Sequence, residues 1–205
     1  PLPSVYTDEE IRAILGSIDR STVQGSRDFA ILMLASSLGI RASDICEMTL
    51  EAINFVKNEL SFIQKKTSVP LTLPLLPDVK EALLGYLGYR KIDSTDEPIF
   101  IQCRAPYHKL TRMGIWTIMR RYVKQSGVDP GHRKRGTHAL RSSLASSMVR
   151  EQVPYYAVQK ILGHESPQST KNYVRIDIGR LREFTLPVPE AYGRFDAFLK
   201  GGETR

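Results

Sequence analysis

The sequence lacks the marks of a membrane, secreted or metal-binding protein. No apolar run approaches the length of a membrane span, and no signal peptide is visible. The two cysteines, Cys46 and Cys103, do not have the spacing of a metal site, and their apolar neighbours favour free, buried thiols in a reducing compartment. No cluster of carboxylates suited to Mg²⁺ is visible either. We therefore expect a cytoplasmic protein with no membrane partner, no metal and no cofactor.

Acidic residues are scarce in one segment of the chain. From Arg104 to Arg150 there are eleven Lys or Arg against one acid, Asp129, which gives a net charge of +10. Residues 1–103 carry −4 and residues 151–205 carry +1, so the formal net charge of +7 is concentrated in one block. A surface that binds a polyanion requires such a block. The charge alone would equally fit a solvated basic face.

The rest of the composition is ordinary for a globular protein. With 205 residues and 41% hydrophobic residues, the chain can form one large domain with a core. Apolar residues at helical spacing, preceded by capping residues such as Thr7, Thr111 and Thr137, predict that helices dominate. Helices are expected from Asp8, over 27–37, from Ser43, over 77–89 and 112–126, and from Thr137, Pro154, Ser166 and Pro189.

Residues 52–75 have a different pattern, in which strands alternate with turns. Strands are predicted over 52–56, 60–63 and 70–75, and a short fourth one over 99–101. The expected fold class is therefore α+β, mainly helical, with a small antiparallel sheet. Residues 1–186 would form one domain, and 187–205 a tail helix that either folds back or docks on a neighbouring copy. Because the chain begins with Pro1 and not with Met, we expect a fragment.

Two arginines lie in settings that suggest a phosphate site. Arg141 follows His138 by three residues, so both side chains would share one face of a helix. A guanidinium group matches two phosphate oxygens, and a phenol such as that of Tyr173, aimed at the phosphate, is a potential nucleophile. Arg41 comes directly after a buried helix that Gly39 can end, and Asp44 is near enough to orient it.

These residues form an ordered set of motifs. The set is Gly39-Ile40-Arg41, Lys66-Thr67, His138-x-x-Arg141, Leu162-Gly163-His164 and Thr170-x-x-Tyr173. In this order and spacing it resembles the catalytic domain of the tyrosine recombinases, the phage-integrase family. The resemblance covers nearly the whole chain, and it implies the fold of that domain. It also implies that a separate N-terminal DNA-clamping domain of the family is absent from this fragment.

The resemblance implies a chemical role for each matching residue. Arg41 and Arg141 would clamp the scissile phosphate, and Tyr173 would attack phosphorus to form a 3′-phosphotyrosine. Lys66 would protonate the leaving 5′-hydroxyl, and His138 would act as the general base for the phenol.

Two further residues would support this chemistry. His164 would donate a hydrogen bond to the phosphate, and Asp44 would buttress Arg41. The chemistry suits these residue types, because guanidinium groups stabilise the charge that builds on a phosphodiester and a phenol must lose its proton to attack.

The basic residues outside this set are expected to contact DNA. The predicted DNA-binding residues are Lys65, Arg120, Arg121, Lys124, Arg133, Lys134 and Arg135. On the helix over 112–126, Trp116 is predicted to face inward. Two positions depart from the family pattern. Ser142 stands where the family often has a His, and Gln152 stands near the position where the family often has a Gly. We expect both to alter packing and to leave activity intact.

The sequence therefore predicts a site-specific DNA recombinase, an integrase or transposase of a mobile element. It would cut and rejoin double-stranded DNA without metal or ATP, within a tetramer. Two alternatives stay open at this point. A type IB topoisomerase uses similar chemistry on one duplex, and a DNA-binding accessory protein could carry the same fold with idle catalytic machinery.

Overall fold

The computed structural model describes residues 5–90 and 97–163, and these residues are mainly helical. The helices are α1 (Asp8–Gly16), α2 (Val23–Ser37), α3 (Ala42–Glu47), α4 (Pro77–Leu87), α5 (Arg112–Gln125), α6 (Thr137–Arg150) and α7 (Tyr155–Leu162). A 3-10 turn, η1 (Leu50–Ala52), leads into the strands β1 (Ile53–Asn54), β2 (Glu59–Ile63) and β3 (Pro70–Pro74). The predicted fold class, α+β with a small antiparallel sheet, is confirmed.

Side chains at the helix ends explain where α1 and α2 begin. Thr7 and Glu10 form the predicted capping box, in which Thr7 Oγ1 accepts from the Glu10 amide at 3.2 Å and the Thr7 amide donates to Glu10 Oε2 at 2.8 Å. Thr22 caps α2 by accepting from the amide of Gly25, so α2 begins before the apolar stretch from which it was predicted. After α2, Gly39 has the predicted left-handed conformation, with φ +64°.

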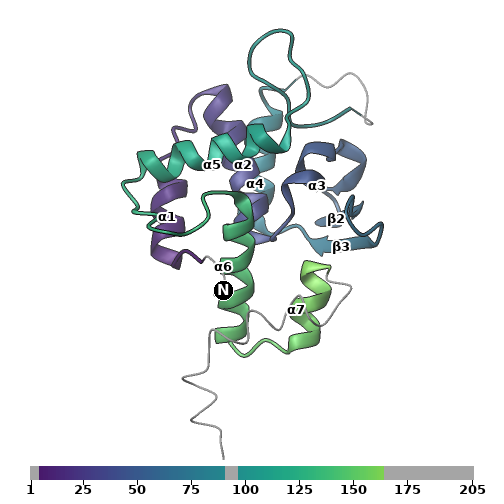
Figure 1. Cartoon of the computed structure of the whole chain (residues 1–205). Helices are drawn as coiled ribbons and strands as arrows, with labels where there is room; N and C mark the ends of the chain where they lie inside the picture. The colour runs from purple at the N-terminus through teal and green to yellow at the C-terminus, as the bar shows by residue number, and fades with distance from the viewer. Residues whose placement is uncertain (1–4, 91–96, 164–205) are drawn as a thin grey trace, which may run out of the picture.

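Helix α2 lies at the centre of the core. It packs against α4 and α6, and also against α1, α3 and α5. Its residues Ile31, Leu32 and Leu34 are fully buried, because the helix is apolar on nearly all sides. Figure 1 shows α1 on one side of this centre and α3 with the sheet on the other, while α6 and α7 extend below it.

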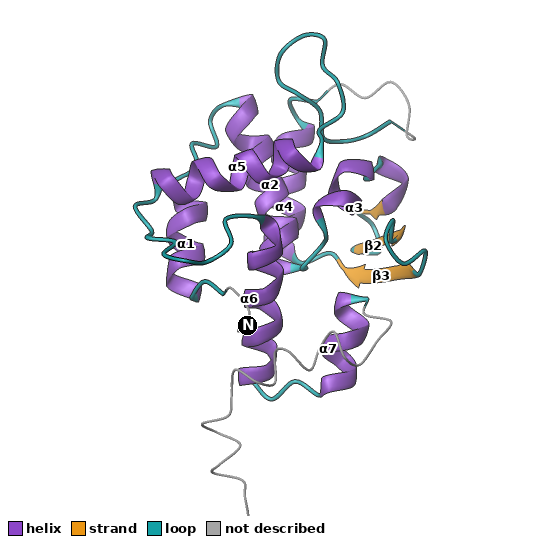
Figure 2. Cartoon of the chain, in the orientation of Figure 1, coloured by secondary structure: helices purple, strands orange, loops and turns teal. Residues whose placement is uncertain are grey.

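The sheet has the strand order β1-β2-β3, with both pairs antiparallel. Figure 2 shows β2 and β3 in orange, next to α3. Leu60 of β2 lies opposite Leu73 of β3, and both are buried. The residues on either side of each leucine in its own strand are exposed. This alternation fixes the register, because a shift by one residue would expose the apolar face. The turn between β2 and β3 therefore carries Lys65 and Lys66 at a defined position.

Three local predictions were wrong. Residues 99–101 form no strand in the described chain, and only isolated bridges join Thr49 to Pro98 and Ile101 to Lys109. Thr137 is the buried first residue of α6, and Gly136 occupies the capping position. Trp116 is 39% exposed, because the buried stripe of α5 begins at Ile115 instead.

Several predictions fall outside the described residues. These are His164, Tyr173, the helix expected from Ser166 and the tail over 187–205. In the part of the chain that the structure describes, no helix is long and apolar enough to cross a membrane.

Candidate active site

Arg141 lies on the first turns of α6 and is 3% exposed. Its Nη1 donates to the carbonyl oxygen of Gly39, and its Nη2 donates to the carbonyl oxygen of Leu162. Gly39 precedes α3, and Leu162 ends α7, so a single guanidinium group joins three segments of the fold. Gly39 packs closely against the end of α7, because a Cβ atom at position 39 would come within 2.8 Å of the Leu162 side chain.

Arg41 reaches the same place from the start of α3. Its Nη2 donates to the carbonyl oxygen of Gly163 at 3.3 Å, next to the carbonyl that Arg141 binds. Its Nη1 is buried and has no hydrogen-bond partner among the described residues. A buried guanidinium nitrogen without an acceptor is unfavourable, so this donor is suited to an anionic ligand. The two predicted phosphate-binding arginines are thus brought together at the end of α7.

Asp44 is bound from the sheet and not by Arg41. Its Oδ1 accepts a hydrogen bond from the backbone amide of Lys65 at 2.9 Å and lies 3.3 Å from Ser43 Oγ. Among the described residues it forms no hydrogen bond or ion pair with Arg41, and its Oδ2 has no partner. The side chain of Asp44 is buried, and its bond to the Lys65 amide links the β2–β3 turn to α3. The sequence led us to expect a contact with Arg41 instead.

Lys66 lies exposed in that turn, whereas Lys65 is tied to the protein surface. Lys65 Nζ forms an ion pair with Glu47 Oε1 at 2.5 Å, and Lys109 Nζ binds Glu47 Oε2 at 2.7 Å. These two lysines hold the pKa of Glu47 below its usual value by hydrogen bonding to it. Lys66 makes no such pair within the described chain, so its ammonium group remains available for chemistry.

A cavity of about 460 Å³ opens beside Lys66. It is lined by Ser43, Cys46, Glu47, Lys65, Lys66, Lys109, Leu110, Thr111 and Arg112. Cys46 is a free, buried thiol, and burial followed by the charge of Glu47 raises its pKa to about 11. The thiol is therefore protonated and uncharged at neutral pH. Lys65, Lys66, Lys109 and Arg112 give the lining of the cavity more positive than negative charge.

Four cationic groups act on the pKa of His138. Although the residue is exposed, burial of its imidazole against the protein is the first cause that lowers its pKa. The positive charges of Lys134, Arg141, Arg41 and Lys66 lower the pKa further, in that order. These groups come from the loop before α6, from α6, from α3 and from the sheet. A neutral imidazole in such surroundings can accept a proton at neutral pH.

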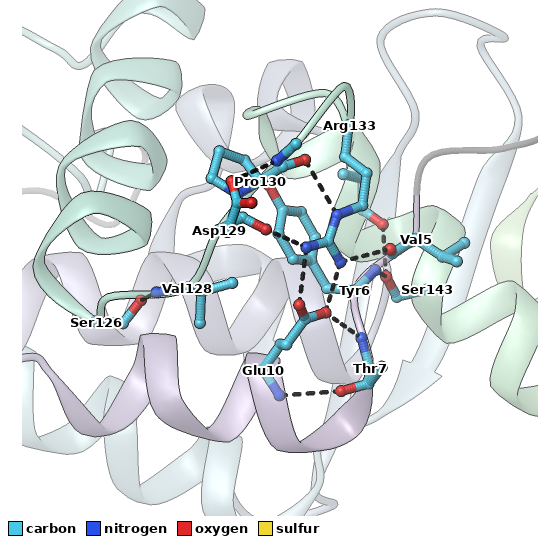
Figure 3. A network of polar contacts seen from close by, with 12 residues as sticks. Val5, Tyr6, Thr7, Glu10, Ser126, Val128, Asp129, Pro130, Arg133 and Ser143 are labelled. Atoms are coloured by element: carbon cyan, nitrogen blue, oxygen red, sulfur yellow. Dashed lines mark hydrogen bonds and ion pairs between the residues drawn. The ribbon is translucent and has the colours of Figure 1, made fainter.

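Arg133 is held inside a network that joins the first described residues to the loop before α6 (Figure 3). Its two terminal nitrogens bind Glu10 at 2.6 and 2.8 Å, and its guanidinium group lies 4.4 Å from the centre of the Tyr6 ring. Further donors reach the carbonyl oxygens of Val5, Asp129 and Pro130. A phosphate would have to displace one of these bonds, so the structure favours a structural role where we predicted a DNA contact.

The other predicted DNA-binding residues keep exposed side chains. Arg120, Lys124, Lys134 and Arg135 are exposed, whereas Arg121 pairs with the buried Asp28 at 3.3 Å. Arg120 lies over the ring of Trp116 at 5.4 Å. Trp116 in turn contacts Gly136, where an added Cβ would come within 3.0 Å of the indole ring. Helix α5 therefore presents its exposed basic residues beside the loop that leads to His138, and they stay candidates for contacts to phosphates.

The site contains one residue that the sequence did not single out. Gln64 is 1% exposed and donates to the carbonyl oxygen of Leu162 at 3.4 Å, which links the turn of Lys66 to the end of α7. The only sequence signal is a polar residue at the end of a strand. The predicted site residues His164 and Tyr173 follow Gly163 in the chain and lie outside the described residues.

Comparisons with known proteins agree with this arrangement. The phage integrase family matches residues 4–180. The protein y4gC of Sinorhizobium fredii, which is named an integrase/recombinase, is 34% identical over 189 residues, which cover 92% of this chain and 97% of y4gC. Tyrosine recombinase XerA of Pyrococcus furiosus is 30% identical over 187 residues, which cover 89% of this chain and 60% of XerA.

A solved structure has the same fold. The site-specific recombinase XerH, bound to a palindromic difH substrate in a post-cleavage complex, matches with a TM-score of 0.74 and 21% identity. The match covers 89% of this chain and 52% of the XerH chain. The present chain thus spans almost all of y4gC but only about half of XerH and 60% of XerA.

Proposed function

This chain belongs to the phage integrase family, the tyrosine recombinases, and on that basis we propose that it is the catalytic domain of a site-specific DNA recombinase. The observation that carries the proposal is that Arg41 and Arg141 donate to the adjacent carbonyl oxygens of Gly163 and Leu162, while Arg41 keeps a buried nitrogen without a partner among the described residues. The partner would be double-stranded DNA, because XerH is bound to its difH substrate and the basic segment over 104–150 suits a polyanion. The alternatives, a topoisomerase and an idle accessory protein, are less favoured, because the relatives are recombinases.

The proposed reaction replaces one phosphodiester bond by another. The phenolic oxygen of Tyr173 forms a bond to phosphorus as the bond between phosphorus and the 5′-oxygen breaks, and the phenolic proton passes to His138. The leaving oxygen takes a proton from the ammonium group of Lys66. Arg41, Arg141 and His164 would stabilise the charge on the phosphoryl oxygens. The bond energy is kept in the phosphotyrosine, so the reverse attack by a 5′-hydroxyl rejoins the strand without ATP.

Each side chain suits its role for a physical reason. Arg41 has a buried nitrogen without a partner, as a phosphate clamp requires. His138 has a lowered pKa, so the imidazole is neutral and able to accept the phenolic proton. Lys66 is exposed beside a cationic cavity, where its ammonium group can donate a proton. A general acid typically accelerates such a step by about 10²–10⁴-fold, because an alkoxide is a poor leaving group.

A tetramer on two DNA sites is part of the proposal, with the tail over 187–205 docking on a neighbouring protomer. Deletion of residues 189–205 is expected to weaken pairing of two sites and to leave binding of one site unchanged. Unchanged recombination by the deleted protein would remove this part of the proposal.

Covalent trapping tests the proposed chemistry. A suicide DNA substrate, nicked so that the cleaved fragment diffuses away, should yield a covalent adduct that migrates slowly on a denaturing gel. Tyr173→Phe should form no adduct. Tyr156, which is 72% exposed on α7, provides the matched control, and Tyr156→Phe should form as much adduct as the wild type. An adduct that persists in Tyr173→Phe would show that another residue is the nucleophile.

A second assay separates the recombinase from a topoisomerase. Relaxation of supercoiled DNA that carries no specific site would support the topoisomerase alternative. Adduct formation only on DNA that carries a specific site would support the recombinase.

A further inference from the structure

Gln64 closes the turn that carries Lys66. It directly follows β2, its amide donates to the carbonyl oxygen of Val69 at 3.0 Å, and its carbonyl oxygen accepts from the amide of Ser68 at 2.8 Å. The backbone of Gln64 therefore forms the base of the hairpin. Contacts that fix the position of Gln64 therefore also fix the position of the Lys66 backbone.

The side chain of Gln64 ties this hairpin to the end of α7. Its Oε1 accepts from Thr67 Oγ1 at 2.8 Å, and its Nε2 donates to the carbonyl oxygen of Leu162 at 3.4 Å. Thr67 directly follows Lys66, so the bond between Thr67 and the side-chain amide of Gln64 stabilises the turn next to Lys66. At 1% exposure the amide is shielded from water, and loss of either bond would leave a buried polar group unpaired.

The same end of α7 is bound by both arginines. Arg141 donates to the carbonyl oxygen of Leu162, and Arg41 donates to that of Gly163. Gly163 has φ +58°, and a Cβ atom there would lie only 2.3 Å from Gln64 Nε2. A glycine is therefore needed both for the left-handed backbone and for the close approach of Gln64. Three side chains from three segments meet on two consecutive carbonyl groups.

The position of the Lys66 ammonium group depends on the backbone turn, because no hydrogen bond or ion pair within the described chain holds the Lys66 side chain itself. It is exposed, and within the described chain no ion pair holds its ammonium group, whereas Lys65 pairs with Glu47. A lysine side chain has many rotamers, so the direction of the backbone turn decides which atoms it can reach. Asp44 anchors the turn at the Lys65 amide, and Gln64 anchors it at Thr67.

We propose that Gln64 is a positioning residue that places Lys66 relative to Arg41 and Arg141 through the shared carbonyl groups of Leu162 and Gly163. The inference rests on the proposed function of Lys66 as the acid that protonates the leaving oxygen. Gln64 is buried, so we assign it no contact with a reacting atom. Its effect on DNA cleavage passes through the location of the ammonium group, so a change at Gln64 impairs the same step as a change at Lys66.

A substrate with a sulfur atom in place of the bridging 5′-oxygen tests this directly. A thiolate leaves without protonation, so cleavage of the sulfur substrate does not need the acid. Gln64→Glu keeps the shape of the side chain but removes the donor to Leu162 and places a carboxylate oxygen against that carbonyl. We expect it to cleave the oxygen substrate roughly 10²-fold more slowly than the wild type, within the range for loss of a general acid. On the sulfur substrate it should approach the wild-type rate.

Control variants separate this inference from the proposed function. Lys66→Ala should show the same rescue by sulfur, whereas Arg141→Lys should be slow on both substrates, because a phosphate clamp is needed for either leaving group. Gln125→Glu is the matched control, since Gln125 Nε2 also donates to a backbone carbonyl, that of Ser17 at 2.7 Å, but on the far end of α5. It should cleave both substrates at the wild-type rate.

The outcomes are distinct. If sulfur rescues Lys66→Ala but not Gln64→Glu, or if Gln64→Glu cleaves the oxygen substrate normally, the positioning role is wrong. If sulfur does not rescue Lys66→Ala, the proposed acid is wrong and the inference falls with it. Thr67→Val, which removes only the hydroxyl partner of Gln64, serves if Gln64→Glu does not fold. It should show a smaller defect with the same rescue by sulfur, and a defect that is equal on both substrates would overturn the inference.

Discussion

Arg41 and Arg141 donate hydrogen bonds to adjacent carbonyl groups at the end of α7, although they lie in distant parts of the chain. The two residues differ in how much the protein depends on them. Arg141 is 3% exposed and binds two carbonyl oxygens, in the loop before α3 and at the end of α7. Arg41 makes one bond of 3.3 Å and keeps a buried nitrogen without a partner among the described residues. Arg141 therefore joins three segments of the fold, whereas Arg41 keeps a donor that the proposed phosphate could use.

This difference predicts that the two alanine variants separate in stability. Arg141→Ala removes the Arg141 donor from the buried Gly39 carbonyl and, among the described residues, leaves the Leu162 carbonyl with only the 3.4 Å bond from Gln64, so we expect the free energy of unfolding to fall by about 2–4 kcal/mol. Arg41→Ala should lower it by less than about 1 kcal/mol, because it removes one weak bond and an unpaired buried donor. Both variants should lose formation of the covalent adduct. Urea unfolding, followed by circular dichroism, measures the difference, and equal losses of stability would contradict it.

The pKa of His138 predicts the pH dependence of cleavage. Burial and then the charge of Lys134 lower this pKa, so the imidazole stays neutral and able to accept a proton below the usual titration range of histidine. Lys134→Met removes a positive charge and should raise the pKa of His138. The acid limb of the cleavage rate, measured in single turnovers at saturating DNA, should therefore move to higher pH.

Lys124→Met provides the control for that measurement. Lys124 is also an exposed lysine of the basic segment, but it is not among the leading charges that lower the pKa of His138. Its loss should leave the midpoint of the acid limb unchanged. If Lys134→Met and Lys124→Met gave the same midpoint as the wild type, His138 would not be the group that titrates.

Sequence reasoning reached the elements that local patterns determine. The capping box at Thr7, the left-handed Gly39 and the end of α7 at Gly163 follow from residues that lie next to each other in the chain. A site that joins Arg41, Lys66, Arg141 and His138 was expected only because the family resemblance implies it, since no local pattern in the sequence contains such contacts. The phase of α5 was predicted wrongly at Trp116, although the spacing of Ile115, Ile118, Met119, Tyr122 and Val123 would have placed Trp116 outside the buried stripe.

Side-chain partners were the least predictable part. Sequence proximity and the family resemblance both pair Asp44 with Arg41, but the carboxylate accepts its hydrogen bond from the Lys65 amide in the β2–β3 turn. Arg133 was assigned to DNA on its charge, but Glu10 of α1 binds it. Both partners come from elements distant in sequence, and the choice among competing charged groups depends on packing that composition does not encode.

Gln152 predicts a stabilising substitution. It lies directly after the end of α6 with φ +61°, a left-handed conformation that costs a residue with a Cβ atom about 1 kcal/mol. Gln152→Gly should therefore raise the free energy of unfolding by about 0.5–1 kcal/mol, and Gln152→Ala should leave it near the wild-type value. Cleavage activity should not change. A loss of stability in the glycine variant, measured by urea unfolding, would mean that the Gln152 side chain makes a contribution larger than the strain.

The network around Arg133 predicts that this residue supports the fold and Arg135 contacts DNA. Arg133 binds both carboxylate oxygens of Glu10 and holds the pKa of that carboxyl below its usual value by hydrogen bonding, whereas Arg135 is exposed. Arg133→Met should lower the free energy of unfolding by about 2 kcal/mol, since hydrogen bonds to a charged group are lost from a partly exposed site. Arg135→Met should leave stability within about 0.5 kcal/mol of the wild type.

Salt dependence of DNA binding separates the two roles. Each phosphate contact adds roughly one unit to the slope of log affinity against log salt concentration, because a bound counterion is released. Arg135→Met should reduce that slope by about one unit, and Arg133→Met should leave it unchanged in protein that is still folded. Fluorescence anisotropy over a range of NaCl concentrations gives both slopes. If Arg133→Met reduced the slope and kept full stability, the sequence prediction of a DNA contact would be correct and the Glu10 pair would be incidental.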